Sequence, residues 1–543
     1  MEGIADFLDS LIGGISLIFY ALTIGGLIWG LVVLRPWNKN TRYNPTLLKE
    51  TIALIYRGAF ALIGCQLLKI ILKIWLINVT LEMPPFPAFA HTTQFQAGLL
   101  QAVFTIILAI YLTVYLKANP ASKKHWLISA SLAIPLIITG AWLVHGAGRF
   151  DDRAFLMSFT VLHQLGAAAW IGSIFQILNL WRLTQQEIIN PELWPLLLRR
   201  FSKLGIGAVV LILASGLPMA FSYISDINGL VGTGYGNLLM VKIALLAVAL
   251  GFAVLNNRAV GAYFSKGVKY SLNRCVPHYV TVEFIILITV LFTAASLASQ
   301  PPAIDIPSLT ASWEEVLNVF APRIPRTTSP SHAALIAGEA GRIAIIGQTP
   351  SEAATAWSDY NHNIAGIFLA VMSFFAMLSY NKYCRFARFW PLGFIGLAIF
   401  LFFRADAESW PMGELGFWES MAGNSEVLQH RLSTLIAFAL GAMELQARLT
   451  KNPDSSLPYI FPILSAIGGL ILLTHSHVGF QAKTTFLIQI SHILMGVFAI
   501  ILACGRWLEL KLEGSGKQFA GFISVFALFQ IGLILMFYRE PLY

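Results

Sequence analysis

Apolar segments of about twenty residues recur along this whole chain, and this pattern constrains its fold more than any other feature. A helix of that length crosses the hydrocarbon core of a bilayer and satisfies its own backbone hydrogen bonds there. Only 12% of the 543 residues are charged, against about 25% in a typical soluble domain. The sequence therefore predicts an all-α polytopic membrane protein.

The apolar runs define about fourteen predicted transmembrane helices, eight before and six after one long hydrophilic stretch. They cover roughly residues 10–34, 52–79, 95–116, 126–146, 154–181, 202–224, 237–255, 279–299, 361–380, 388–403, 427–447, 458–476, 485–505 and 518–538. The acidic start of the chain lacks the features of a signal peptide, so we interpret the first run as a retained helix. We divide the chain into helices 1–4 (1–153), a four-helix domain (154–302), a hydrophilic loop (303–360) and a six-helix domain (361–543).

The basic residues predict which side of the membrane each loop faces. Of the 36 Lys and Arg residues, 23 lie in one set of alternate loops and nine in the opposite set. Loops rich in Lys and Arg stay in the cytoplasm, so both termini and the long loop are predicted to lie outside. The basic residues form no stripe and no nucleic-acid-binding motif, so we expect membrane lipid around this chain and exclude nucleic acid as a partner.

Nine of the eleven histidines fall at or near the predicted outer side, and two of them, His163 and His492, lie two to three turns into their predicted helices, inside the membrane. A polar side chain inside a membrane is costly and points to function. Neutral imidazole binds copper, zinc and haem iron, so we predict a metal site on this side. The candidate ligands are His91, His145, His163, His430, His475, His477 and His492.

Several carboxylates and thioethers are weaker candidate ligands. The acidic loop 404–431 could attract a cation beside His430, methionine sulfur is a soft ligand for Cu(I), and two intramembrane carboxylates could meet a cation in transit. A solvated loop, ordinary packing and structural ion pairs, for example with Lys242, are the alternatives. These candidates are Asp406, Glu408, Met157, Met219, Glu283 and Glu444.

The histidines of the six-helix domain also allow a different cofactor. His362, His430, His475 and His492 are predicted at similar depth on adjacent helices, an arrangement that could hold haem b between two imidazoles. An electron-transfer protein or metal reductase is therefore an alternative, and only with haem would we expect an enzyme. The sequence contains no ATP-binding loop, covalent haem-attachment motif or hydrolase motif.

Four stretches of the second domain resemble the membrane domain of the copper resistance protein D (CopD) family. In order they read LHQLGAAAWIGS (162–173), RFSKLGIGAVVLILASGLPMAF (200–221), TGYGNLLMVKIALLAVALGFAVLNNR (233–258) and VEFIILITVLFTAASLASQPP (282–302). The resemblance covers about residues 154–302, and the six C-terminal helices are similar to the second half of longer family members. Many relatives carry two glycines where this chain has Gly172 and Ser173.

The resemblance implies copper homeostasis, resistance or import at the bacterial inner membrane. The chain would bind copper on the periplasmic side, with His163 as a ligand and Glu283 as the family's glutamate, and move the ion across. A separate periplasmic CopC-type protein is the implied partner. An assembly factor for a membrane copper enzyme is a third interpretation. The sequence leaves several points open: the transport direction, the oxidation state of copper, the energy source, the oligomeric state and whether histidines are shared between sites.

Overall fold

The computed structural model describes residues 2–37, 45–81, 89–339, 350–450, 452, 455–474 and 482–541. Regular structure in these ranges is helical, apart from one isolated β-bridge between Ser409 and Leu415. Among the described residues, twelve helices are long and apolar enough to cross a membrane. Two shorter apolar helices, Leu392–Arg404 and Leu457–Leu473, fall on the two remaining predicted segments. The prediction of an all-α polytopic membrane protein is confirmed, while the number of helices that cross and the side of the termini stay predictions.

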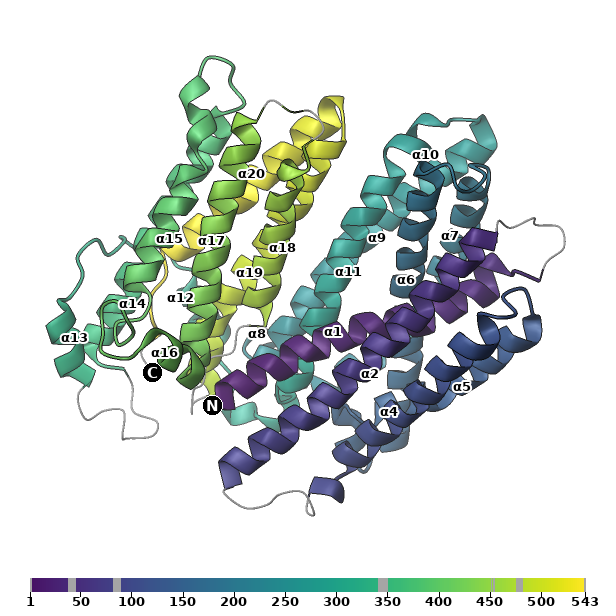
Figure 1. Ribbon diagram of the computed structural model, residues 1–543. Coiled ribbons are helices and arrows are strands. Elements are labelled where there is room, and N and C mark those ends of the chain that lie inside the picture. Colours follow the sequence, from purple (N-terminus) through teal and green to yellow (C-terminus); the bar gives the residue numbers. More distant parts are fainter. Residues whose placement is uncertain are drawn as a thin grey trace. The chain divides into compact units, whose positions relative to one another are not determined.

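The chain divides into two compact units, which we describe separately (Figure 1). The N-terminal unit comprises Leu8–Ser225 and Lys242–Ser299, and the C-terminal unit comprises Gln300–Tyr543 together with Met1–Phe7 and Asp226–Val241. Many large apolar side chains stay exposed on each unit, for example Val210 at 61% and Phe374 at 61%. Such surfaces suit contact with lipid tails, which are as apolar as the side chains themselves.

The N-terminal unit is a bundle of long helices. Its main elements are α1 (Glu2–Ile28), α2 (Pro45–Leu81), α4 (Thr93–Tyr111), α5 (Lys123–Ala141), α6 (Arg153–Gln185), α7 (Leu193–Tyr223), α9 (Gly234–Lys266) and α11 (Val276–Ser299). Helix α6 packs along α7 and also contacts α2, α5 and α11. The buried core includes Ile55, Leu108, Trp126 and Ala168. Helix α6 therefore places its side chains among several neighbouring helices.

The C-terminal unit is a second helical bundle. Its long helices are α14 (Glu352–Leu378), α15 (Leu392–Arg404), α17 (Ser425–Leu449), α18 (Ile460–Leu473), α19 (Ala482–Lys511) and α20 (Gly514–Met536). The unit also contains four short helices, α8 (Ile227–Val231), α12 (Trp313–Val319), α13 (His332–Glu339) and α16 (Phe417–Gly423). Within this unit α13, α16 and the C-terminus gather at one end of the bundle (Figure 1). This end belongs to the side that the basic residues predict to be outer.

Two glycines bring α1 and α6 into direct backbone contact. A Cβ atom at Gly172 would collide with the carbonyl oxygen of Ala21, and one at Gly25 would collide with that of Ala168. Each helix thus contributes a pair of small residues four positions apart, the pattern that lets membrane helices approach closely. Gly172 belongs to the first CopD-like stretch, so the small residues of that stretch serve helix packing.

We expect Gly172→Ala to destabilise the protein, since the added methyl group must push α1 away from α6. Overpacking of this kind costs about 1–3 kcal/mol of unfolding free energy. Gly205→Ala on α7 is the matched control, because its methyl group would meet no atom within 4 Å. Thermal unfolding of the detergent-solubilised protein measures both. Equal midpoints for the two variants would contradict the proposed contact.

Candidate functional site

His163 lies on α6 and points its imidazole at α7. Its Nδ1 atom is 3.2 Å from the carbonyl oxygen of Ile212 and 3.3 Å from Oγ of Ser215. A carbonyl oxygen can only accept a hydrogen bond, so Nδ1 carries the proton and Nε2 of the neutral ring keeps its lone pair. Metal-binding histidines commonly show this arrangement, in which the second nitrogen donates to a carbonyl and orients the ring.

On α7, a small residue and a thioether lie near the imidazole of His163. A Cβ atom at Gly216 would lie 3.1 Å from Cε1 of His163, so the absence of a side chain there admits the ring. Thr160 lies one turn before His163 on α6, and its hydroxyl is 3.5 Å from the sulfur of Met219. His163 and Met219 therefore occupy successive turns of the same α6–α7 contact. Imidazole and thioether are both ligands for copper, and the thioether favours Cu(I).

The positive charge of Lys242 on α9 acts on the imidazole of His163. A cation bound at His163 would be repelled by this ammonium group if the lysine were protonated. The sequence alone suggested Lys242 as an ion-pair partner for Glu283. The hydrogen bonds of Glu283 instead go to two other residues, so this suggestion was wrong as far as the described contacts extend.

Glu283 on α11 is 1% exposed and receives a hydrogen bond on each carboxylate oxygen. Trp170 Nε1 on α6 donates to Oε1 at 2.7 Å, and Asn256 Nδ2 on α9 donates to Oε2 at 2.9 Å. Three helices of the N-terminal unit meet in this contact. Sequence reasoning missed Trp170 and Asn256, although a tryptophan inside the first CopD-like stretch and an asparagine in an apolar helix were visible signals.

The other candidates in the N-terminal unit are not gathered around His163. His145, in the short helix His145–Gly148, lies edge-on to Tyr223 with ring centroids 6.4 Å apart. His91 is exposed before α4, and Met157 is partly buried on the first turn of α6. Among the residues that the structure describes, no group of three or more His, Cys, Asp and Glu could hold a metal ion.

In the C-terminal unit, His430 pairs with Asp406 of the acidic loop. Nδ1 of His430 is 2.9 Å from Oδ1 of Asp406, and Arg431 Nε is 3.9 Å from Oδ2. Arg431 also donates to the carbonyl oxygens of Phe402 and Trp410. Asp406 therefore has a structural role in holding the loop against α17. Glu408 is exposed.

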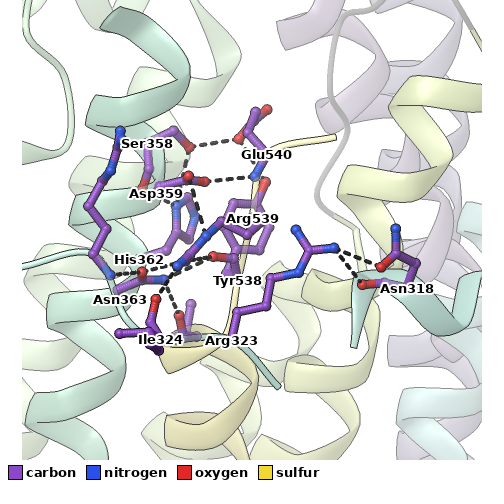
Figure 2. A network of polar contacts seen from close by, with 12 residues as sticks. Asn318, Arg323, Ile324, Ser358, Asp359, His362, Asn363, Tyr538, Arg539 and Glu540 are labelled. Atoms are coloured by element: carbon purple, nitrogen blue, oxygen red, sulfur yellow. Dashed lines mark hydrogen bonds and ion pairs between the residues drawn. The ribbon is translucent and has the colours of Figure 1, made fainter. Parts of the chain in front are cut away.

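Two predicted haem ligands, His362 on α14 and His492 on α19, come together. Their ring centroids are 5.9 Å apart and their planes meet at 87°. The Tyr538 ring lies against His362, with the ring centroids 4.1 Å apart and the planes tilted by 30° (Figure 2). His475 and His477 lie outside the described residues.

The segment after α20 is tied to the start of α14 by a polar network (Figure 2). Glu540 Oε2 accepts hydrogen bonds from Ser358 Oγ at 2.7 Å and Tyr538 OH at 2.8 Å. The Glu540 backbone N–H donates to Asp359 at 2.8 Å, and Arg539 lies 3.7 Å from the same carboxylate. Burial raises the pKa of the Glu540 carboxyl and, with the nearby carboxylates, that of the Tyr538 hydroxyl. Sequence reasoning did not anticipate this network.

Glu444 belongs to an ion-pair network at the other end of the C-terminal unit. Its Oε1 atom is 2.8 Å from Arg448 Nε and 2.8 Å from Arg506 Nη2, and Arg506 also pairs with Glu509. Tyr380 donates to Glu509 at 2.7 Å, and burial beside this carboxylate raises the pKa of the Tyr380 hydroxyl. The structural ion pair considered for Glu444 is therefore present.

We expect Glu444→Gln to destabilise the C-terminal unit strongly. The change leaves the two arginines without a buried counter-charge, a loss that typically costs about 3–5 kcal/mol. Glu50→Gln is the control, since its pair with Arg182 is exposed and is expected to contribute about 0–1 kcal/mol. Thermal unfolding would again compare them. A Glu444→Gln variant as stable as Glu50→Gln would refute a structural role for Glu444.

Comparison with known proteins matches part of the chain to one family. Residues 195–297 match the profile described as "Copper resistance protein D", a segment that contains Met219, Asn256 and Glu283 and begins after His163. The chain is 26% identical over 221 residues, 40% of its length, to "Copper transport protein CutJ" of Bacillus subtilis (strain 168). It is 27% identical over 135 residues, 24% of its length, to "Copper resistance protein D" of Pseudomonas syringae pv. tomato.

These alignments span 39% and 44% of the lengths of the two relatives. No solved structure matches the chain. The profile match overlaps the second, third and fourth of the stretches on which the resemblance rests. Part of the chain, residues 195–297, is therefore similar to the CopD family.

Proposed function

We propose that this chain is an inner-membrane protein that binds copper on the periplasmic side and moves it across the membrane. The names of the two similar proteins, a copper transport protein and a copper resistance protein, support the choice of metal. The contact between α6 and α7 carries the proposal, because His163 and Met219 present an imidazole and a thioether on successive turns. This pair suits copper better than a hard cation such as Mg²⁺.

In this proposal His163 is the first ligand within the membrane. Its Nδ1–H bond to Ile212 holds the ring in place, and Nε2 is the donor atom. The Glu283 carboxylate, oriented by Trp170 and Asn256, is the next negative group available to the ion.

The energy for movement would come from the copper gradient or the membrane potential, because the sequence contains no ATP-binding motif. A potential of 100 mV is worth about 2.3 kcal/mol per elementary charge. A separate periplasmic CopC-type protein would deliver the ion, a partner inferred from the family resemblance.

Haem binding in the C-terminal unit is the second candidate function, and the proximity of His362 and His492 favours it. Two imidazoles can also ligate haem iron in an electron-transfer protein or metal reductase. A visible spectrum of the purified protein decides the matter, since bound haem gives an intense Soret band. A role as assembly factor predicts copper binding without uptake.

We expect His163→Ala to reduce copper uptake into proteoliposomes by at least about tenfold, because the first intramembrane ligand is lost. Met219→Leu keeps the volume but removes the sulfur, so uptake should fall by a smaller factor. His125→Ala is the control, since this histidine contacts Tyr111 at the predicted cytoplasmic side. Uptake by the His163→Ala variant at the rate of the unsubstituted protein would rule out this route.

Gly216→Ala tests the geometry of the same site without removing a ligand. The new methyl group would lie 3.1 Å from Cε1 of His163 and force the ring to shift. We expect copper affinity to fall by about tenfold, as measured by competition with a chromogenic Cu(I) chelator. Gly207→Ala, where a methyl group meets nothing within 4 Å, should leave affinity unchanged. Equal affinity in both variants would mean that copper does not bind at His163.

A further inference from the structure

We propose that a polar ridge on α6 lines a water-filled path by which copper leaves Glu283 toward the predicted cytoplasmic side. The ridge consists of Ser173, Gln176 and Asn179 and is called the exit ridge below. This inference rests on the proposed function for its cargo and deepens it, because it assigns residues to the second half of the path.

The exit ridge connects the Glu283 contact with the end of α6. Every third residue of this helix from Trp170 to Arg182 carries a polar group, and side chains three positions apart are neighbours on a helix surface. Trp170 at one end donates to Glu283, and the exposed Arg182 at the other end donates to Glu50. Twelve residues of helix rise about 18 Å. The row therefore spans more than half of a hydrocarbon core of about 30 Å.

The three side chains of the exit ridge are buried, yet several of their polar atoms have no hydrogen-bond partner among the described residues. Ser173 is 0% exposed, Gln176 1% and Asn179 8%. The atoms without such a partner are Oγ of Ser173, both amide atoms of Gln176 and Nδ2 of Asn179. Each unsatisfied buried group costs about 1–3 kcal/mol, so a purely structural contact between helices does not account for three in succession. Water and a passing ion supply the partners that such groups need, and polar side chains inside a membrane mark ion pathways.

Helix α1 makes room for the middle of the exit ridge. A Cβ atom at Gly26 would lie 3.3 Å from Nε2 of Gln176 and 2.6 Å from Cγ1 of Ile55 on α2. Because residue 26 has no side chain, the Gln176 amide lies where α1, α2 and α6 come together. Trp29 follows Gly26 by three residues and is 1% exposed, and its Nε1–H finds no acceptor in the described part of the chain. Trp29 thus contributes a further polar atom one turn along.

The chemistry of the exit ridge suits release of copper. The ridge offers hydroxyl and amide groups, whereas copper is bound best by imidazole and sulfur ligands. An ion that leaves the carboxylate of Glu283 is therefore held weakly at each step, as conduction requires. At the end of the row Glu50 places a carboxylate beside Arg182, so the guanidinium charge there is balanced.

Cysteine accessibility tests whether water reaches the exit ridge. The four native cysteines are first replaced by serine, and a quaternary-ammonium methanethiosulfonate is added to inside-out membrane vesicles. We expect Ser173→Cys, Gln176→Cys and Asn179→Cys to react at least about tenfold faster than the controls, because a thiol in dry apolar surroundings seldom ionises. The matched controls are Ile171→Cys and Ile174→Cys. Both residues are buried, and each lies two positions from a ridge residue, on the opposite side of the helix.

Copper flux tests whether the ion uses the same path. Gln176→Leu removes both amide atoms, so we expect uptake into proteoliposomes to fall by at least about tenfold. Copper binding by the purified protein should stay unchanged, because His163 is intact. Thr289→Val on α11 is the control, since this buried hydroxyl already donates to the carbonyl of Ile285. Thermal midpoints show whether each variant is folded, and Ser173→Ala replaces Gln176→Leu if the latter is not.

The outcomes separate this inference from the proposed function. Equal reaction rates at the ridge and control positions would refute a water-filled exit, whether or not the protein transports copper. Fast ridge cysteines in a protein that takes up no copper would overturn the proposed function and the cargo assigned to the path. Unchanged uptake by a folded Gln176→Leu protein would leave the transport proposal standing and remove the exit ridge from it.

Discussion

The cost of burying polar groups away from water governs this structure. Lipid offers no hydrogen-bond partners, so a buried polar group is stabilised by partners inside the protein. Glu283 meets the requirement with two side-chain donors from two other helices, and Glu444 meets it with two arginines. Among the described residues, no basic side chain pairs with the Glu283 carboxylate, whereas two arginines neutralise that of Glu444. That difference makes Glu283 the better candidate for a functional group and Glu444 a structural one.

Close helix contacts complement these polar contacts. Without a strong hydrophobic force between helices in lipid, association depends on packing and on hydrogen bonds between helices. The contact of Gly25 with α6 and of Gly172 with α1 provides the packing, while Trp170, one helical half-turn from Gly172, provides a hydrogen bond to α11. The first CopD-like stretch thus combines a small-residue contact on one face with a polar contact on another. Its small and apolar character reflects these packing requirements.

The sequence predicted the helices well because their length and apolar character follow from the thickness of the bilayer. Even the short segment 388–403 coincides closely with Leu392–Arg404. The partners of the buried residues were harder to predict. A membrane helix that is apolar on all faces has no hydrophobic stripe in its sequence, so the sequence does not show which face contacts which neighbouring helix. Asn256 could therefore not be predicted as a hydrogen-bond partner of Glu283. His163 was identified from its cost in lipid, and its contact with the Ile212 carbonyl required the structure.

Three histidines within the helices follow one rule. An imidazole in an apolar helix bundle needs an acceptor for its N–H group, and backbone carbonyl oxygens are the nearest acceptors. His163 donates to a carbonyl of α7, whereas His362 and His492 donate to carbonyls of their own helices. In each case the hydrogen bond that makes burial tolerable also directs Nε2 away from the backbone. The hydrogen bond that lowers the cost of burying each imidazole therefore also fixes the orientation of its ring.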